Sequence, residues 1–259
     1  MQVIGCQLDI AWEDKSTNFE RVRALLKNVA IEPGALIVLP EMFATGFSMH
    51  VAATAEAAQG ETYQFLAQLA RDTASFLLAG VVTRNPDGRG RNEALVLGPQ
   101  GDEVARYCKL HPFSFAGEDQ HFAAGDAALS FASGPFRVAP FVCYDLRFPE
   151  IFRHQTRLGA QVLVVIANWP APRDAHWQAL LRARAIENQA YVVGVNRVGR
   201  DPKLAYAGHS LIIDPRGETL TAGSDREELV VASLQLEPLL EYRRQFPAID
   251  DMRAEYFRS

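Results

Sequence analysis

The sequence of 259 residues has few cysteines, no long apolar run and no excess of positive charge. Each of these absences argues against one class of protein. The three cysteines, Cys6, Cys108 and Cys143, are odd in number, widely spaced and without the short spacings of a metal site. We therefore expect reduced thiols in the cytoplasm rather than structural disulfides. We also expect no bound metal and no other cofactor.

Long hydrophobic segments are also missing. The longest apolar run, residues 162–167, is far too short to span a bilayer, and residues 1–6 lack the basic start of a signal peptide. A formal net charge of -5 argues against a nucleic acid partner, because phosphate binding relies on basic patches. We expect neither a membrane segment nor a nucleic acid interface.

The composition is that of an ordinary globular protein, with 48% hydrophobic and 22% charged residues. No internal repeat, low-complexity tract or linker marks a boundary, so we expect a single domain over residues 1–259. Strand-like and helical segments interleave, with hairpins between them. This order predicts an α/β protein with mixed sheets covered by helices.

Several local patterns predict individual elements. The continuous apolar runs 35–39 and 162–166 indicate strands buried on both faces. Thr17 and Glu20 resemble a capping box that opens a helix. The turn signal at 214–217 predicts a closing hairpin, with strands at residues 210–213 and 229–234.

The C-terminal segment, from about residue 238 onward, is rich in large apolar side chains among charges. These are Tyr242, Phe246, Ile249, Met252, Tyr256 and Phe257. Such groups need a surface to cover, either on their own core or on a neighbouring subunit. We expect partial burial in a dimer interface, and therefore a homodimer or a higher homo-oligomer.

Three expected strands each end in a residue that can carry chemistry, namely Glu41, Lys109 and Cys143. Taken alone, Glu41 is a typical solvated loop carboxylate and Cys143 a typical small buried hydrophobe. In an α/β sheet, however, the carboxyl ends of strands converge on one crevice even when they are far apart in sequence. We therefore treat the three residues as one candidate site.

The residues that follow Cys143 predict its surroundings. Pro149 and Glu150 suit the first turn of a helix, where proline loses no hydrogen bond and an acid faces the positive helix end. Backbone N–H groups and a helix N-terminus near the sulfur favour the thiolate, which is the reactive form.

These segments resemble known motifs. Residues 39–43, 107–111 and 142–150 are similar to the Glu, Lys and Cys motifs of the nitrilase (carbon–nitrogen hydrolase) superfamily, and the resemblance covers almost the whole chain. It implies an αββα sandwich, with two sheets between helical layers. Within the superfamily, residues 109–119 and 168–177 resemble the ω-amidases, including the bacterial 2-oxoglutaramate amidases.

The resemblance implies a mechanism for amide hydrolysis. Glu41 would take the thiol proton, and Cys143 would attack the amide carbon to give a thioester. Lys109 and the backbone N–H of Tyr144 would hold the oxyanion. A second glutamate, Glu118, would lie beside the triad and orient the substrate or the lysine.

The resemblance also implies a substrate, a small dicarboxylic acid monoamide of the 2-oxoglutaramate or 2-oxosuccinamate type. Its free carboxylate needs a cationic partner, for which Arg147 and Arg173 are candidates because a guanidinium matches a carboxylate. Aromatic side chains could wall the pocket, although aromatics are more often part of the core. The candidates are Phe115, Phe47 and Trp169.

Other functions stay open at this point. The six histidines allow a Cys–His thiol hydrolase, with His111 or His176 as the base, although the spacing matches no local protease signature. A non-catalytic binding protein with the same fold is a second alternative. An N-carbamoyl or aliphatic nitrile hydrolase of the same superfamily is a third, because pocket shape decides between these substrates.

Overall fold

The structure, a computed structural model, describes residues 1–253 and 255. Its first six-stranded sheet mixes parallel and antiparallel pairs. In spatial order the strands are β14 (Glu228–Ser233), β1 (Gln2–Gln7), β2 (Leu36–Val38), β3 (Phe76–Arg84), β4 (Gly90–Leu97) and β5 (Glu103–Cys108).

The second six-stranded sheet is also mixed. Its strands are, in spatial order, β13 (Thr219–Ala222), β12 (Leu211–Ile213), β9 (Tyr191–Asn196), β8 (Val162–Ala167), β7 (Phe136–Val142) and β6 (Phe131–Ser133). A separate two-stranded hairpin consists of β10 (Val198–Arg200) and β11 (Ala205–Ala207).

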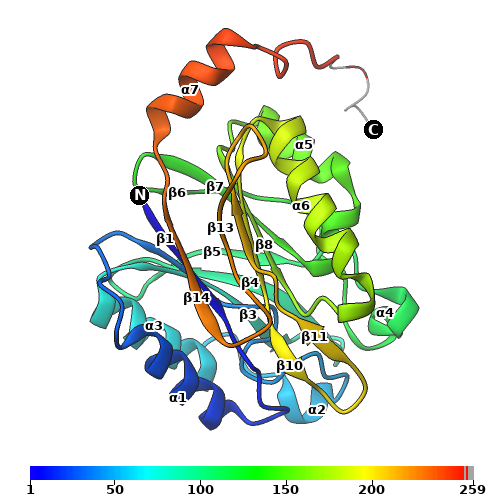
Figure 1. Cartoon of the computed structure of the whole chain (residues 1–259). Coiled ribbons are helices and arrows are strands. Elements are labelled where there is room, and N and C mark those ends of the chain that lie inside the picture. Colours follow the sequence, from blue (N-terminus) through cyan, green and yellow to red (C-terminus); the bar gives the residue numbers. More distant parts are fainter. Residues whose placement is uncertain (254, 256–259) are drawn as a thin grey trace.

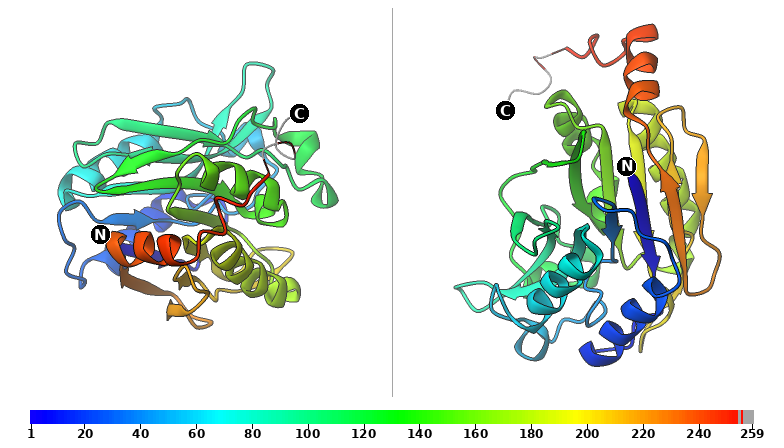
Figure 2. Two further views of the ribbon diagram at one scale, coloured as in Figure 1. Left: turned by 90° about the horizontal axis from the view of Figure 1, so that it is seen from above. Right: turned by 90° about the vertical axis from the view of Figure 1, so that its left-hand side faces the viewer.

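Helices cover the outer face of each sheet, so the layers run helix, sheet, sheet, helix (Figures 1 and 2). The first sheet is covered by α1 (Lys15–Leu26) and α3 (Glu61–Thr73), and the second by α5 (Pro149–Arg157) and α6 (Asp174–Asn188). The other helices are α2 (Val51–Thr54), α4 (Glu118–His121) and α7 (Leu236–Gln245), with 3-10 turns at Ser114–Ala116, Cys143–Arg147 and Ala171–Arg173. This architecture confirms the predicted αββα sandwich.

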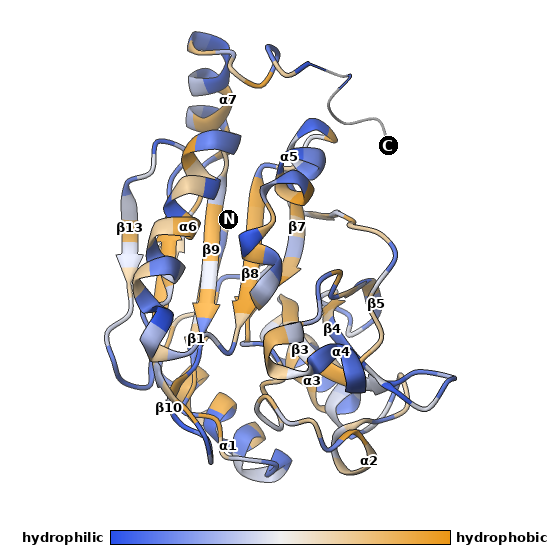
Figure 3. Ribbon diagram, turned by 90° about the vertical axis from the view of Figure 1, so that its right-hand side faces the viewer, coloured by the Kyte–Doolittle hydropathy of each residue, from blue (hydrophilic) through white to orange (hydrophobic). Residues whose placement is uncertain are grey.

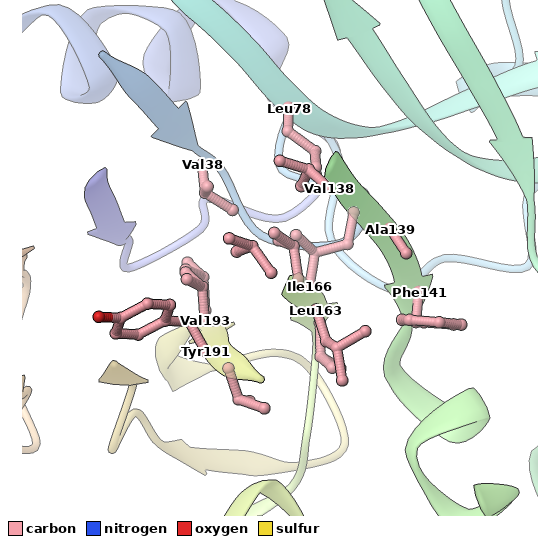
Figure 4. Close-up of a cluster of buried hydrophobic side chains, with 14 of the residues drawn as sticks. Val38, Leu78, Val138, Ala139, Phe141, Leu163, Ile166, Tyr191 and Val193 are labelled. Carbon is pink, nitrogen blue, oxygen red and sulfur yellow. The ribbon is translucent and has the colours of Figure 1, made fainter. Parts of the chain in front are cut away.

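Apolar side chains of both sheets fill the space between them. Val38 and Leu78 of the first sheet share a buried cluster with Val138 and Ile166 of the second (Figure 4). All six residues of β8 are buried, as expected for a strand covered on both faces. Figure 3 shows β8 and its neighbours among the most hydrophobic strands.

Strand direction decides where the candidate residues lie. Because β3 is antiparallel to β4, and β4 to β5, strand β5 runs in the same direction as β2, which is parallel to β3. Glu41 and Lys109 therefore leave the same edge of the first sheet. Strands β7 and β8 are parallel, so Cys143 and Asn168 leave the same edge of the second sheet.

Two local predictions are wrong. The helix predicted to be capped by Thr17 begins at Lys15, and its cap is Asp14, whose Oδ1 accepts the N–H of Thr17 at 3.1 Å. The predicted closing hairpin does not exist: β12 pairs with β13, whereas β14 crosses to β1 in the other sheet. Strand β13 was missed because its residues are mostly exposed and lack an apolar pattern.

The C-terminal helix α7 extends beyond the end of the sandwich (Figure 1). Arg243 anchors it by donating to the backbone oxygens of Gln189 at 2.9 Å and Ala160 at 3.0 Å. Phe246, just after the helix, is 58% exposed. Tyr256 and Phe257, which also belong to the predicted interface, lie outside the described residues.

Candidate active site

A cavity of about 290 Å³ opens at the edges where the candidate strands end. Cys143 lies on its wall, together with Tyr144 and Asn168. Glu41 and Lys109 lie behind this wall and are 0% and 1% exposed. The cavity therefore presents the sulfur to a ligand, while the two charged groups are shielded from water.

The carboxylate of Glu41 is held at both oxygens. Its Oε1 accepts from Lys109 Nζ at 2.9 Å and from Asn92 Nδ2 at 2.7 Å. Its Oε2 accepts the backbone N–H of Asn168 at 2.8 Å, which joins the end of β2 to the end of β8 in the other sheet. The site is thus built across the two sheets.

A second buried carboxylate, Glu118, shares the same donors. Lys109 Nζ lies 2.8 Å from Glu118 Oε2, and Asn92 Nδ2 donates to Glu118 Oε1 at 2.8 Å. The backbone N–H of Phe113 donates to Glu118 Oε2 at 2.6 Å. Two carboxylates therefore surround one ammonium, and the ring of Phe47 covers that ammonium at 5.5 Å.

Glycine 80 allows the backbone of β3 to pass close to Glu41. A Cβ at Gly80 would lie 2.4 Å from the Glu41 Cα and 2.4 Å from the backbone N of Met42. These contacts are with backbone atoms, which cannot move aside as a flexible side chain does. The close approach of β3 thus fixes the segment that carries the carboxylate.

The protonation states follow from burial and charge. Burial raises the pKa of Glu41, but the charge of Lys109 and the hydrogen bonds outweigh it and hold the pKa below the usual 4.5. Burial lowers the pKa of Lys109, but the charges of Glu118 and Glu41 outweigh it and raise the pKa. Glu41 is therefore a carboxylate and Lys109 an ammonium.

Cys143 does not carry the favoured thiolate that the sequence predicts. Burial, and then the negative charge of Glu41, raise the pKa of its thiol well above 9.0, and the opposing effect of Lys109 is smaller. The direction of the shift is opposite to the one expected from the sequence, because burial and the neighbouring carboxylate outweigh the ammonium. The resting site therefore holds a thiol next to a carboxylate base.

The backbone at Cys143 has an uncommon conformation. Its φ is +48°, in the left-handed region that residues other than glycine rarely adopt. The residue joins β7 directly to the turn Cys143–Arg147, and α5 begins at Pro149 as predicted. This sharp bend places the sulfur on the cavity wall.

The remaining predicted residues divide into two groups. Tyr144, Arg147, Trp169 and Arg173 line the cavity, as does Phe47. The other two do not, for different reasons. Glu118 is 0% exposed and contacts Lys109 instead, whereas Phe115 is absent from the cavity lining and is 83% exposed.

Phe115 is therefore a correction. It belongs to the short turn Ser114–Ala116, and its exposed ring has its centroid 6.0 Å from the Arg173 guanidinium carbon. The preceding aromatic, Phe113, lines the cavity instead. Sequence alone could not separate two aromatics spaced by one residue in an irregular loop.

Sequence reasoning missed Asn92, Asn168 and Lys203. Asn92 is buried near the start of β4. The signal in the sequence was a polar residue shortly before an apolar run. Asn168 directly follows the buried strand β8, and Glu41 likewise lies shortly after the buried strand β2. Lys203 lies on the loop between β10 and β11, and no pattern linked this loop to the site.

Histidines do not form a Cys–His pair in residues 1–253 and 255. His111 Nδ1 lies 2.9 Å from Asp145 Oδ1, and His176 Nδ1 lies 3.3 Å from Arg147 Nη2. The histidine on the cavity wall is His50, whose side chain is 72% exposed and paired with Glu13. The geometry thus supports Glu41 rather than a histidine as the base.

No group of three or more His, Cys, Asp or Glu side chains within residues 1–253 and 255 is arranged to hold a metal ion. None of the helices in the described part of the chain combines the length and hydropathy needed to cross a bilayer.

Comparison with known proteins agrees with this geometry. The carbon–nitrogen hydrolase profile matches residues 4–244. The chain belongs to the carbon–nitrogen hydrolase family. Among relatives of this hydrolase, the omega-amidase YafV of Escherichia coli (strain K12) is 40% identical over 100% of this chain and 98% of the relative.

Two further relatives of the hydrolase also match over nearly their full length. The 2-oxoglutaramate amidase of Bacillus subtilis (strain 168) is 33% identical over 98% of each chain. The crystal structure of XC1258 from Xanthomonas campestris, a CN-hydrolase superfamily protein with an arsenic adduct in the active site, superposes with a TM-score of 0.92. It is 33% identical and covers 98% of this chain and 97% of its own.

The double hydrogen bond from Asn92 generates a prediction. Asn92→Ala removes a donor to the Glu41 carboxylate, so the pKa of Glu41 should rise. Because Glu41 accepts a proton only when ionised, the fall in the rate of Cys143 alkylation by iodoacetamide at acid pH should begin at a higher pH. The rate is measured by mass spectrometry of the Cys143 peptide over a pH series.

The matched control is Asn188→Ala, which removes a buried asparagine of α6 that donates to Arg184 O. This substitution should leave the pH dependence of Cys143 alkylation unchanged. Burial raises the pKa of Cys108 to about 11, so that thiol should react slowly. An unchanged pH dependence of alkylation in Asn92→Ala would show that Asn92 does not affect the pKa of Glu41.

Proposed function

We propose that this hydrolase is an amidase that cleaves the C–N bond of a small ω-amide of a dicarboxylic acid, of the 2-oxoglutaramate or 2-oxosuccinamate type, to a carboxylate and ammonia. The observation that carries the proposal is the Cys143 thiol on the wall of a cationic cavity, with the Glu41 and Lys109 charges directly behind it. Full-length relatives named omega-amidase and 2-oxoglutaramate amidase support the same reaction.

The first half of the reaction forms a thioester. The Glu41 carboxylate accepts the proton of the Cys143 thiol as the sulfur attacks the amide carbon. The C=O electron pair moves to oxygen, and the ammonium of Lys109 and the backbone N–H of Tyr144 stabilise the oxyanion. When the oxyanion collapses, the C–N bond breaks, and Glu41 returns the proton to the leaving nitrogen, which departs as ammonia.

The second half hydrolyses the thioester. Glu41, again a carboxylate, accepts a proton from water as the water oxygen attacks the thioester carbon. The new oxyanion uses the same two donors, and its collapse breaks the C–S bond. The sulfur regains a proton from Glu41, and the acid product leaves. Glu118 keeps Lys109 in place throughout, since its carboxylate lies 2.8 Å from Nζ.

Two arginines are suited to the free carboxylate of the substrate. The Arg147 guanidinium carbon lies 4.8 Å from the Trp169 ring centroid, and that of Arg173 lies 5.5 Å from the Phe113 ring centroid. A stacked guanidinium has few orientations left, so its N–H fork is pre-organised for a carboxylate.

A third cation, Lys203, lies on the loop between β10 and β11, which also lines the cavity. Asp201 shapes this loop: its Oδ1 accepts the backbone N–H groups of Lys203 at 2.7 Å and Leu204 at 2.6 Å. Its Oδ2 accepts the hydroxyl of Tyr206 at 2.5 Å. The acid on the cavity wall is thus occupied by donors of its own loop, which leaves the three cations to attract an anionic substrate.

Removal of the reacting groups tests the mechanism. Cys143→Ala and Lys109→Ala should each lower kcat/KM for 2-oxoglutaramate by at least about 10³-fold, because one removes the nucleophile and the other an oxyanion partner. His176→Asn should retain activity within about threefold. Ammonia release is the measurement, and an active Lys109→Ala protein with an inactive His176→Asn protein would support a Cys–His enzyme instead.

The substrate range needs a panel in the same assay. Glutamine, 2-oxosuccinamate, N-carbamoyl amino acids and simple nitriles should all react more slowly than the 2-oxo acid ω-amides. A preferred nitrile or carbamoyl substrate would move the chain to another activity of its superfamily, and no reaction with any of them would favour a binding protein. A chelator should not inhibit, since the mechanism uses no metal.

The three cations of the cavity wall lead to a separate prediction. Arg147→Gln, Arg173→Gln and Lys203→Gln should lower kcat/KM for glutaramate, mainly through KM, by about tenfold or more at each residue that contacts the carboxylate. Pentanamide, a neutral primary amide, should be affected less than about threefold. Lys27→Gln removes an exposed charge just after helix α1, outside the cavity lining, and serves as the control. Equal effects on both substrates would exclude carboxylate recognition.

We further propose that residues 1–259 form one domain, and that the protein works in the cytoplasm as a homodimer or a higher homo-oligomer. The projecting helix α7 and the exposed ring of Phe246 support an interface at the C-terminal segment. Analytical ultracentrifugation should give at least a dimer, and Phe246→Asp should weaken it. A monomer at micromolar concentration would contradict this interface.

A further inference from the structure

One buried carboxylate, that of Asp145, lies outside the proposed triad and connects the segment that carries Lys109 with the segment that carries Cys143. Asp145 is 0% exposed and does not line the cavity. Its Oδ2 accepts the hydroxyl of Tyr107 at 2.7 Å and the backbone N–H of Val142 at 3.0 Å. Its Oδ1 accepts the backbone N–H of His111 at 3.1 Å and lies 2.9 Å from the Nδ1 of the same residue.

The partners of Asp145 bracket the reacting residues. Tyr107 and His111 lie two positions before and two positions after Lys109, and Val142 directly precedes Cys143. The carboxylate therefore binds both flanks of the lysine segment, at the end of β5, and the start of the cysteine turn, at the end of β7. These strands belong to different sheets, so backbone pairing cannot set the distance between them.

The same carboxylate stabilises an unfavourable backbone conformation. Cys143 has a φ of +48°, which costs free energy in any residue with a Cβ. Asp145 accepts the N–H of Val142 from three residues further along, and this bond closes the turn around Cys143. Without it, the turn has less to hold the sulfur in its strained position.

The donors themselves have little freedom to move. The ring of His111 stacks on Phe148 at 3.8 Å with planes inclined by 10°, and the ring of Tyr107 packs edge-on against Phe141 at 6.2 Å. Tyr107 is also 0% exposed. Asp145 is thus bound by two packed donors of the lysine segment, and it links that segment to the cysteine turn.

We propose that Asp145 is a positioning residue that sets the location of the Cys143 sulfur relative to the Lys109 ammonium. It does not line the cavity and acts through its hydrogen bonds with both segments. Its effect on turnover rests on the proposed function, but its effect on the sulfur does not. A misplacement of about 1 Å in such a site costs about a hundredfold in rate.

Tyr107→Phe is the test, because it removes one of the donors and keeps the ring. It should lower kcat for 2-oxoglutaramate by at least about tenfold, with KM changed less than about twofold. The rate of Cys143 alkylation by iodoacetamide should fall in parallel. Asp145→Asn, which also loses the charge, should lower both rates by about a hundredfold or more.

Tyr191→Phe is the matched control. Tyr191 is 6% exposed, and its hydroxyl donates to the backbone oxygen of Gln235 at 3.0 Å, away from the reacting residues. It should change both rates less than about twofold, although it removes a comparable hydrogen bond. Thermal unfolding of all variants separates loss of position from loss of fold.

The outcomes are distinct. Equal kcat values and equal alkylation rates in Tyr107→Phe and Tyr191→Phe would overturn the positioning role, and this holds even if Asp145→Asn does not fold. Slower alkylation in Tyr107→Phe, in a protein that releases no ammonia from any amide, would support the positioning role and reject the proposed function. Slower alkylation with slower turnover would support both.

Discussion

The buried ammonium of Lys109 is the interaction on which the site depends. Taking a charge out of water is costly, and the cost is offset only if opposite charges and hydrogen bonds replace the lost hydration. Here Glu41 lies 2.9 Å and Glu118 2.8 Å from the same nitrogen, and the Asn92 amide donates to both carboxylates. Removal of Lys109 would leave two buried carboxylates without the counter-charge that they share.

This arrangement also determines the chemistry that the sulfur can perform. The ammonium keeps Glu41 ionised, and burial together with the negative charge of Glu41 raises the pKa of the Cys143 thiol and keeps it protonated. The base and the nucleophile are therefore ready for a proton transfer that has not yet taken place. Such a site can activate its nucleophile when a substrate carbonyl arrives, and it does not need a permanently reactive thiolate.

The two sheets are what bring these groups together. Each supplies parallel strands that end at a common edge, and the two edges are joined by the hydrogen bond from Asn168 to Glu41 and by the contacts of Asp145. Glycine at position 80 lets the backbones of β3 and the Glu41 segment approach closely. The cavity exposes the sulfur, while the protein interior covers the charges, so that hydrogen bonds to the oxyanion act in surroundings poor in water.

The amino-acid sequence by itself determined the buried strands and the helices α5 and α6, because apolar runs and helix-start signals are local features. It also pointed to Glu41, Lys109 and Cys143, each of which lies at the end of an expected strand. The order of the helix and sheet layers was implied by the resemblance to the nitrilase superfamily. Only the tertiary structure decided that β14 crosses to the first sheet, that Phe113 rather than Phe115 faces the cavity, and that Asn92 joins two carboxylates. It also decided the protonation state of Cys143. These properties depend on which distant segments become neighbours, and on the charge and burial they create there, which no local pattern contains.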